Sequence, residues 1–179
     1  MERIIPLHAN SFFIVSNSGG FNQILSYDYY DPEGYYDRLT HRPIDFEKEI
    51  NKLWSNMQDF LDEEIIKINN RVVRPLVRYV DIGHRGSETT PFITWIIFFE
   101  GRFKKDENSF ESWTEKERAT YDFEVYWSFP PGTTIIEIDS PMDYEPQGNL
   151  LVLWARKGDQ VGGYEKIIFK IPIKAVKKD

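Results

Sequence analysis

The segment "PFITWIIFFEGRF", which begins at Pro91, constrains the fold more than any other part of the sequence. Successive side chains of a β-strand point to opposite faces of a sheet, and here both sets are apolar. One set is Ile93, Trp95, Ile97 and Phe99, and the other is Phe92, Ile96 and Phe98. Because apolar side chains must be shielded from water, we expect this strand to need a cover on each face.

A helix with a strong apolar period is predicted from Asp45 to Asn69. Its apolar residues recur at steps of three and four and form one stripe, made of Ile50, Leu53, Trp54, Met57, Phe60, Leu61, Ile65 and Ile68. Asp45 is placed to cap its start, and Asn69 with Asn70 suits its end. We expect this helix to cover one face of the sheet. The other cover is the N-terminal segment around "SFFIV" with the tyrosine-rich segment, or a second copy of the chain.

Segments with a period of two follow this helix, with turn residues between them. Strands are predicted at Val72–Ile82, Phe92–Phe103, Thr120–Phe129, Thr133–Asp139, Asn149–Lys157 and Tyr164–Ile173. In the charged excursion between residues 104 and 120, Ser112 and Glu115 are placed to cap a short helix. Because no helix-length crossover separates the strands, we predict an α+β fold. One long amphipathic helix packs on a curved, mainly antiparallel sheet of about six to seven strands, with a helix-grip or hotdog-like outline.

The composition predicts an acidic globular protein. The 179 residues suit a single domain, residues 1–179, and the formal net charge is −7. This charge disfavours nucleic acid and anionic membranes as partners, because both require concentrated Lys and Arg. The absence of cysteine excludes disulfides, thiolate metal sites and thiol nucleophiles. No phosphate-binding, dinucleotide-binding or zinc-protease motif occurs, so we expect no cofactor and no metal.

The N-terminal twenty residues carry apolar pairs that Pro6, His8 and Asn10 interrupt, and they lack the continuous apolar stretch of a signal peptide. No segment approaches the roughly 18 apolar residues of a membrane span. We therefore expect a cytoplasmic protein. Abundant Ile, Tyr, Glu and Lys beside an absence of Cys is also typical of thermophilic proteins.

The segment "YDYYDPEGYYDR" is the first candidate binding site. It contains five tyrosines, Tyr27, Tyr29, Tyr30, Tyr35 and Tyr36, together with four carboxylates. Tyrosine offers a large contact area at a low cost in conformational entropy, and carboxylates attract a basic partner. Alternatively, the tyrosines cover the second face of the sheet and the carboxylates stay in water.

The segment "DIGHRGSETTP" is the candidate catalytic site. Asp81, His84 and Glu88 lie close together in it, and a histidine oriented by a carboxylate is the minimal acid–base pair. The same three residues offer two oxygen ligands and one nitrogen ligand for a metal. The third interpretation is a surface hairpin in which Gly83 and Gly86 adopt positive φ and the charged residues are solvated.

Two functions follow from these segments. Our leading hypothesis is a non-enzymatic interaction module, in which the tyrosine segment or the doubly apolar strand contacts another protein or its own copy as a homo-oligomer. The alternative is a small-molecule-binding protein or enzyme with an apolar pocket between the helix and the sheet, where Asp81 and His84 supply acid–base chemistry. A nucleic-acid-binding face ranks third; its basic residues alternate along strands and are Arg71, Arg74, Arg78, Lys166, Lys170 and Lys174.

Overall fold

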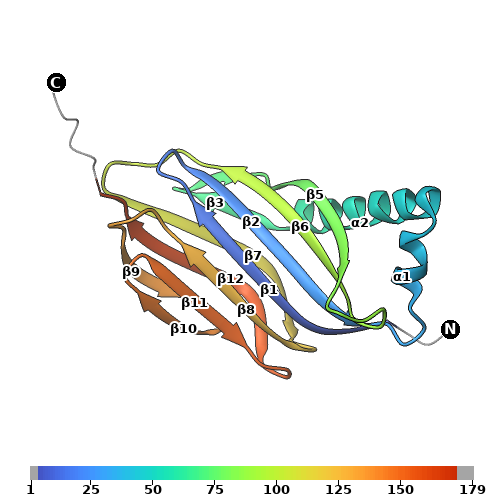
Figure 1. The fold of residues 1–179 in the computed structure, drawn as a ribbon. Coiled ribbons are helices and arrows are strands. Elements are labelled where there is room, and N and C mark those ends of the chain that lie inside the picture. Colours follow the sequence, from blue (N-terminus) through green and yellow to red (C-terminus); the bar gives the residue numbers. More distant parts are fainter. Residues whose placement is uncertain (1–3, 173–179) are drawn as a thin grey trace.

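The computed structural model describes residues 4–172, which fold into two β-sheets and two helices (Figure 1). The larger sheet has seven strands in the order β10-β11-β8-β1-β2-β6-β5. Their bounds are β1 (Ile5–Val15), β2 (Gly20–Tyr30), β5 (Leu76–His84), β6 (Pro91–Glu100), β8 (Asp122–Ser128), β10 (Asp143–Gln147) and β11 (Leu150–Ala155). The smaller sheet has five strands in the order β4-β3-β7-β12-β9. Their bounds are β3 (Ile65–Ile68), β4 (Arg71–Val73), β7 (Glu107–Arg118), β9 (Thr134–Asp139) and β12 (Gln160–Lys170).

After residue 100 the chain passes repeatedly from one sheet to the other. β7, β9 and β12 belong to the smaller sheet, whereas β8, β10 and β11 belong to the larger one. The pair β1–β8 is parallel, and the neighbouring pairs β1–β2 and β11–β8 are antiparallel. Side chains from both sheets meet in a shared apolar core, so the architecture is a two-layer β-sandwich.

The predicted α+β fold, with one long helix on a curved sheet, is therefore wrong. The protein is mostly β, with 56% strand and 16% helix in two sheets and two helices. Polar residues that face inward, Ser11, Gln23 and Ser112, interrupt the apolar alternation of β1, β2 and β7 and hide these strands from a search for apolar periodicity. The predicted charged excursion is β7, the central strand of the smaller sheet, and contains no helix.

The predicted helix begins close to its expected start but is capped differently. α1 (Tyr35–Thr40) precedes α2 (Pro43–Glu63), and Pro43 occupies the start of α2, where its fixed φ favours a helix and its missing N–H costs nothing. The N-cap residue is Arg42, without a side-chain capping bond, so Asp45 lies inside the first turn. Neither described helix is both long and apolar enough to cross a membrane.

The helix ends six residues before its predicted end. Glu63 is its last residue, and Ile65–Ile68 forms β3, which pairs with β7. The β-branched isoleucines favour a strand, and here a neighbouring strand is available to pair with them. Asn69 and Asn70 have φ of 52° and 64° and join β3 to β4, as expected for a two-residue hairpin turn.

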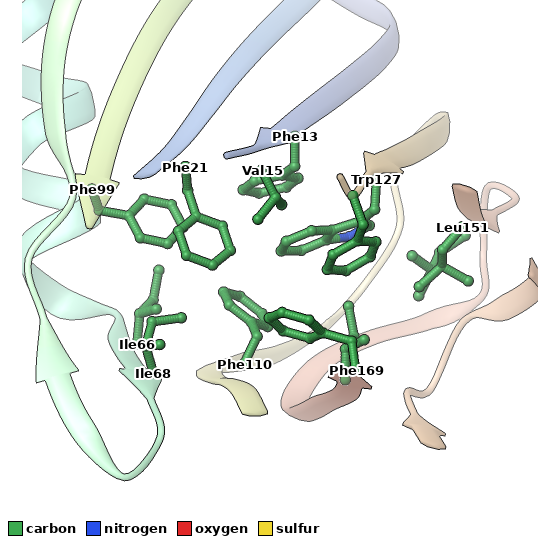
Figure 2. Packing of buried hydrophobic residues seen from close by; sticks show 13 residues of the cluster. Phe13, Val15, Phe21, Ile66, Ile68, Phe99, Phe110, Trp127, Leu151 and Phe169 are labelled. Atoms are coloured by element: carbon green, nitrogen blue, oxygen red, sulfur yellow. The ribbon is translucent and has the colours of Figure 1, made fainter. Parts of the chain in front are cut away.

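One end of the sandwich is filled by large aromatic side chains, which we call the aromatic cluster: Phe13, Phe21, Phe99, Phe110, Trp127, Phe129 and Phe169 (Figure 2). The Phe13 and Trp127 rings stack with centroids 4.0 Å apart, and Phe21 stacks on Phe99 at 4.7 Å. Phe110 and Phe169 approach from the smaller sheet. Burial of such rings contributes roughly 2–3 kcal/mol each, so this cluster holds the two sheets together.

A second cluster lies under the helices. Leu61 of α2, with Tyr36 and Leu39 of α1, packs with β5 and β6 residues that include Ile93 and Trp95. The Trp95 indole N–H donates a hydrogen bond to the Leu53 carbonyl oxygen at 3.2 Å. The helices and the smaller sheet therefore cover the same face of the larger sheet, the face that carries Ile93, Trp95, Ile97 and Phe99.

The opposite face of the larger sheet, which we call the outer face, has no covering element in residues 4–172. The segment "SFFIV" is part of β1 and lies within the larger sheet, so it does not form the predicted second cover. Phe92, Ile96 and Phe98 on this face are only half-buried. The requirement for a second cover, which the sequence predicted, is therefore unmet within the described chain.

Candidate functional site

A cavity of about 360 Å³ lies between the two sheets, next to the aromatic cluster. Phe13, Phe110 and Trp127 form one end of it. Its walls come from β1, β2 and β8 on one side and from β7 and β12 on the other. The volume lies within the range of small-molecule sites, about 300–1,000 Å³.

The cavity exists because side-chain size falls along two facing strands. The inward-facing residues of β1 change from Phe13 to Ser11 and then Ala9. On β7 they change from Phe110 to Ser112. Packed sheets stand roughly 10 Å apart, so small residues that face one another cannot fill the space between them.

The end of α2 and the residue that follows it form another wall. Met57, Phe60 and Leu61 contribute apolar side chains. Phe60 is 55% exposed and therefore lies where the cavity meets solvent. Glu64 follows α2 in an extended conformation, and its side chain lines the cavity beside these residues.

Glu64 and Glu165 are the most strongly perturbed acids of the site. Burial raises the pKa of Glu64 from 4.5 to about 7, and the nearby charge of Glu165 adds to the rise. Burial also raises the pKa of Glu165, although the Ser140 hydroxyl donates a hydrogen bond to its carboxylate at 2.8 Å and partly offsets this effect. Two desolvated carboxyl groups thus interact within one cavity, and such pairs are typical of functional sites.

Neutral polar groups complete the interior. Gln23 donates a hydrogen bond through Nε2 to the Ser11 Oγ at 2.9 Å. The rings of Tyr27 and Tyr121 meet edge to face, with centroids 5.9 Å apart. Burial raises the pKa of both phenols, so both remain neutral hydrogen-bonding groups at physiological pH.

The exposed rim of the cavity is also acidic. Glu115, Glu117 and Asp139 line it and are exposed to solvent. Lys166 is the basic residue in the lining, and its Nζ lies 3.4 Å from a carboxylate oxygen of Glu137. The cavity therefore combines apolar walls with an uncompensated negative charge, which favours a cation over an anion.

The structure does not bring the predicted catalytic residues together. Asp81 and His84 both lie on β5, but Asp81 is exposed, while His84 shares the inward orientation of Ile82. The His84 Nε2 is buried and has no hydrogen-bond partner in residues 4–172. Glu88 lies in the exposed loop that follows β5, and none of the three predicted residues lines the cavity.

The same three residues form no metal site. Residues 4–172 contain no group of three or more His, Asp or Glu side chains that is arranged to hold a metal ion. The acid–base and metal interpretations of this segment therefore have no geometric support. The segment forms the end of β5 and the connection to β6.

The predicted tyrosine site is divided between two surroundings. Tyr27, Tyr29 and Tyr35 are half-buried, Tyr36 is buried, and all four pack in the second cluster. Only Tyr30 of the five is exposed, with 43% of its surface accessible. Most of the tyrosine surface is therefore committed to packing within the chain, and Tyr27 also lines the cavity.

The basic residues of the third hypothesis do not form one free face. Arg74 makes a hydrogen-bonded ion pair with Asp62 at 2.7 Å, and the Lys170 Nζ lies 3.7 Å from Asp106. Arg78 and Lys166 belong to different sheets. Lys174, like Ile173 at the end of the last predicted strand, lies outside the described residues.

Sequence reasoning missed Glu64 and Glu165 as site residues. Glu64 lay within the predicted helix, and Glu165 within the last predicted strand, where alternating polar residues suggest a solvated face. The available signal was the run of small and polar residues at inward positions of β1 and β7, which becomes visible only when these segments are recognised as strands.

Comparisons with known proteins identify no family. No protein-family model matches the chain, and no curated protein matches it. Among solved structures, yeast LTA4 hydrolase in complex with bestatin is 6% identical, with a TM-score of 0.36 over 94% of this chain and 29% of that chain. An aminopeptidase N family protein from Idiomarina loihiensis is 9% identical, with a TM-score of 0.39 over 89% of this chain and 29% of that chain.

A third structure, the M1 zinc metallopeptidase from Deinococcus radiodurans, is 8% identical, with a TM-score of 0.37 over 93% of this chain and 42% of that chain. The chain therefore spans less than half the length of each of these proteins. Similarity of this degree supports no conclusion about the activity of the present chain.

Proposed function

We propose that the protein binds a small amphipathic cation in the cavity between its sheets, such as a primary amine with an apolar body. The observation that carries this proposal is the pair Glu64 and Glu165, two desolvated carboxyl groups in one apolar cavity. The proposal retains the small-molecule alternative but replaces Asp81 and His84, which lie outside the cavity.

Ligands of opposite charge would act differently on the two carboxylates. Desolvation and mutual repulsion disfavour their charged forms, as their raised pKa values indicate. An ammonium group placed near both would offset the repulsion and supply charge-assisted hydrogen bonds. An anionic ligand would add a third negative charge, so the site discriminates between ligands by the sign of their charge.

The walls favour an apolar ligand body. Tyr27, Phe60 and Trp127 present aromatic surface to the cavity. Such rings bind hydrocarbon by burial, and their faces also attract cations by roughly 0.5–2 kcal/mol. A ligand with a charged head and an aliphatic or aromatic tail therefore matches both parts of the lining.

Binding of a cation to this site depends on pH. Glu64 has a pKa near 7 without a ligand, so it must lose its proton to attract an ammonium group. Affinity is therefore expected to rise about tenfold between pH 6 and pH 8, because the charged fraction of Glu64 rises by about that factor.

Isothermal titration calorimetry at pH 8 tests the proposal with phenethylamine, butylamine and the uncharged analogue 2-phenylethanol. We expect phenethylamine to bind most tightly, and Glu165→Gln to weaken it about tenfold through loss of one charge. Glu63→Gln is the control, because Glu63 is an exposed glutamate at the end of α2 that lies outside the cavity. Equal affinity for 2-phenylethanol and phenethylamine, or no binding by either amine, would contradict the proposal.

A further inference from the structure

The outer face of the larger sheet carries a continuous apolar row. Six residues, each paired in register with the next, cross it from β11 to β5: Val152, Tyr126, Phe12, Ile24, Ile96 and Tyr79. Phe12 is 40% exposed and Tyr79 is 52% exposed. We call this set the outer row. Monomeric proteins rarely leave an apolar band of this length in water, so the outer row indicates an interaction surface.

The two ends of the outer row carry opposite charge. At the β10 end, Glu145 pairs in register with Val152 and is exposed. At the β5 end, the Arg78 guanidinium lies 5.7 Å from the Phe98 ring centroid, which places it on the outer face. The row therefore ends beside an acidic residue at β10 and beside a basic residue at β5.

The strand order places β1 in the middle of the sheet, with three strands on either side. We propose that a second copy of this chain covers the outer face, with a two-fold axis parallel to β1. This operation lays β10 of one copy over β5 of the other. Phe12 then meets its own equivalent on the axis, and Glu145 of each copy faces Arg78 of the other.

In this arrangement the Glu145–Arg78 pair forms twice, while the next row brings Asp143 opposite Asp81. The charges therefore set the register of the two copies, and the apolar outer row and its area supply the affinity. The seven strands have five to eleven residues. With about 4.8 Å between strands and about 3.4 Å per residue, they present a face of roughly 900 Å². A standard interface buries about 800 Å² on each partner, so the outer face alone is large enough.

The dimer also supplies the cover that the doubly apolar segment requires. Phe92, Ile96 and Phe98 are half-buried in the single chain, and the helices and the smaller sheet lie on the other side of β6. Packing of two sheets face to face is a common solution for such surfaces. The proposal does not depend on the cavity or on its ligand.

Sedimentation velocity over about 1 to 100 μM protein is the first test. We expect the unmodified chain to dimerise and Ile24→Glu to sediment as a monomer, because it places two charges near the two-fold axis. Ile136→Glu is the matched control, since Ile136 is 47% exposed but lies on β9 of the smaller sheet. Circular dichroism and thermal unfolding establish that both variants fold.

Charge reversal tests the geometry of the interface. Arg78→Glu and Glu145→Arg should each raise the dimer dissociation constant about tenfold or more, because each variant places like charges together twice. An equimolar mixture of the two variants should recover the original affinity, since the heterodimer restores both pairs. A chain that stays monomeric throughout this range, an Ile24→Glu variant that still dimerises, or two charge variants that do not complement one another would overturn the proposal.

Discussion

The two ends of the sandwich differ in the size of the side chains that the same strands direct inward. At one end, Phe21 and Phe99 stack and are almost completely buried. At the other end, Ser11 and Ser112 occupy inward positions of the two facing sheets and leave the cavity between them. β1 and β7 contribute to both ends, so side-chain size rather than strand geometry decides where the protein is filled and where it is hollow.

This difference separates the end that stabilises the fold from the end where we propose a ligand site. The aromatic cluster holds the sheets together by burying apolar surface. The hollow end buries less apolar surface and therefore stabilises the fold less. Instead the hollow end holds Glu64 and Glu165, whose desolvation destabilises the folded state. A protein can maintain such a site only because other regions stabilise the fold sufficiently.

The largest expected effect comes from removing a ring of the aromatic cluster. Phe21→Ala should lower the free energy of unfolding by about 3–5 kcal/mol, because it removes a fully buried ring and leaves a cavity. Urea unfolding measures this change. Phe60→Ala, at the exposed mouth of the existing cavity, should cost less than about 1 kcal/mol. Similar losses for the two variants would show that the two ends are packed alike.

A glycine of β12 gives the next largest effect. Gly162 has φ of 75° at an irregularity of the β7–β12 pairing, and an added Cβ would collide with the Glu115 carbonyl oxygen. Gly162→Ala should therefore cost about 2–3 kcal/mol of unfolding free energy. Gly158→Ala is the control, because its φ is 97° but its surroundings are open, so only about 1 kcal/mol is expected. Equal costs would show that the close approach at the cavity rim is not maintained in solution.

The pH dependence of stability should report the desolvated carboxyl. Because the pKa of Glu64 is about 7 in the folded state and 4.5 without burial, the folded state holds a proton that the unfolded state releases. Stability should therefore fall as pH rises from about 4.5 to about 7, by on the order of 2 kcal/mol after allowance for partial exposure. Urea unfolding at several pH values measures the fall. Glu64→Gln should remove this part of the pH dependence, and Glu63→Gln should retain it.

The smallest effect on stability is expected from filling the cavity. Ser112→Val should change the free energy of unfolding by less than about 1 kcal/mol, because added apolar contacts offset the loss of a buried hydroxyl. The same substitution should weaken phenethylamine binding by occupying its space. Ser109→Val is the control, since Ser109 lies on the opposite face of β7. Unchanged amine affinity in the Ser112 variant would place the ligand elsewhere.

Part of the fold was accessible from the sequence. The apolar stripe predicted α2, and the alternation of β6 was predicted correctly, with Ile93, Trp95, Ile97 and Phe99 on one face. The isoleucines after Glu64 continued the helical period, but pairing with β7 made them a strand. Local sequence could not decide this, because the outcome depended on a neighbouring strand that joins much later in the chain.

The candidate site was less accessible than the fold. Its acids come from the end of α2 and from β12, and its hollow depends on the facing positions of Ser11 and Ser112. These residues are far apart in the sequence. They come together only because the chain passes repeatedly from one sheet to the other. Asp81 and His84, by contrast, are close in sequence but diverge because successive residues of a strand face opposite sides.

The most direct test of the cavity as a cation site is a ¹³C NMR titration of the glutamate side-chain carboxyl groups, with Glu64→Gln to assign the Glu64 signal. We predict a midpoint near pH 7 for Glu64 in the free protein. Saturating phenethylamine should lower this midpoint by about one unit or more, because an ammonium group stabilises the charged carboxylate. A midpoint near 4.5 that phenethylamine does not change would show that Glu64 is solvated and that the cavity is not a cation site.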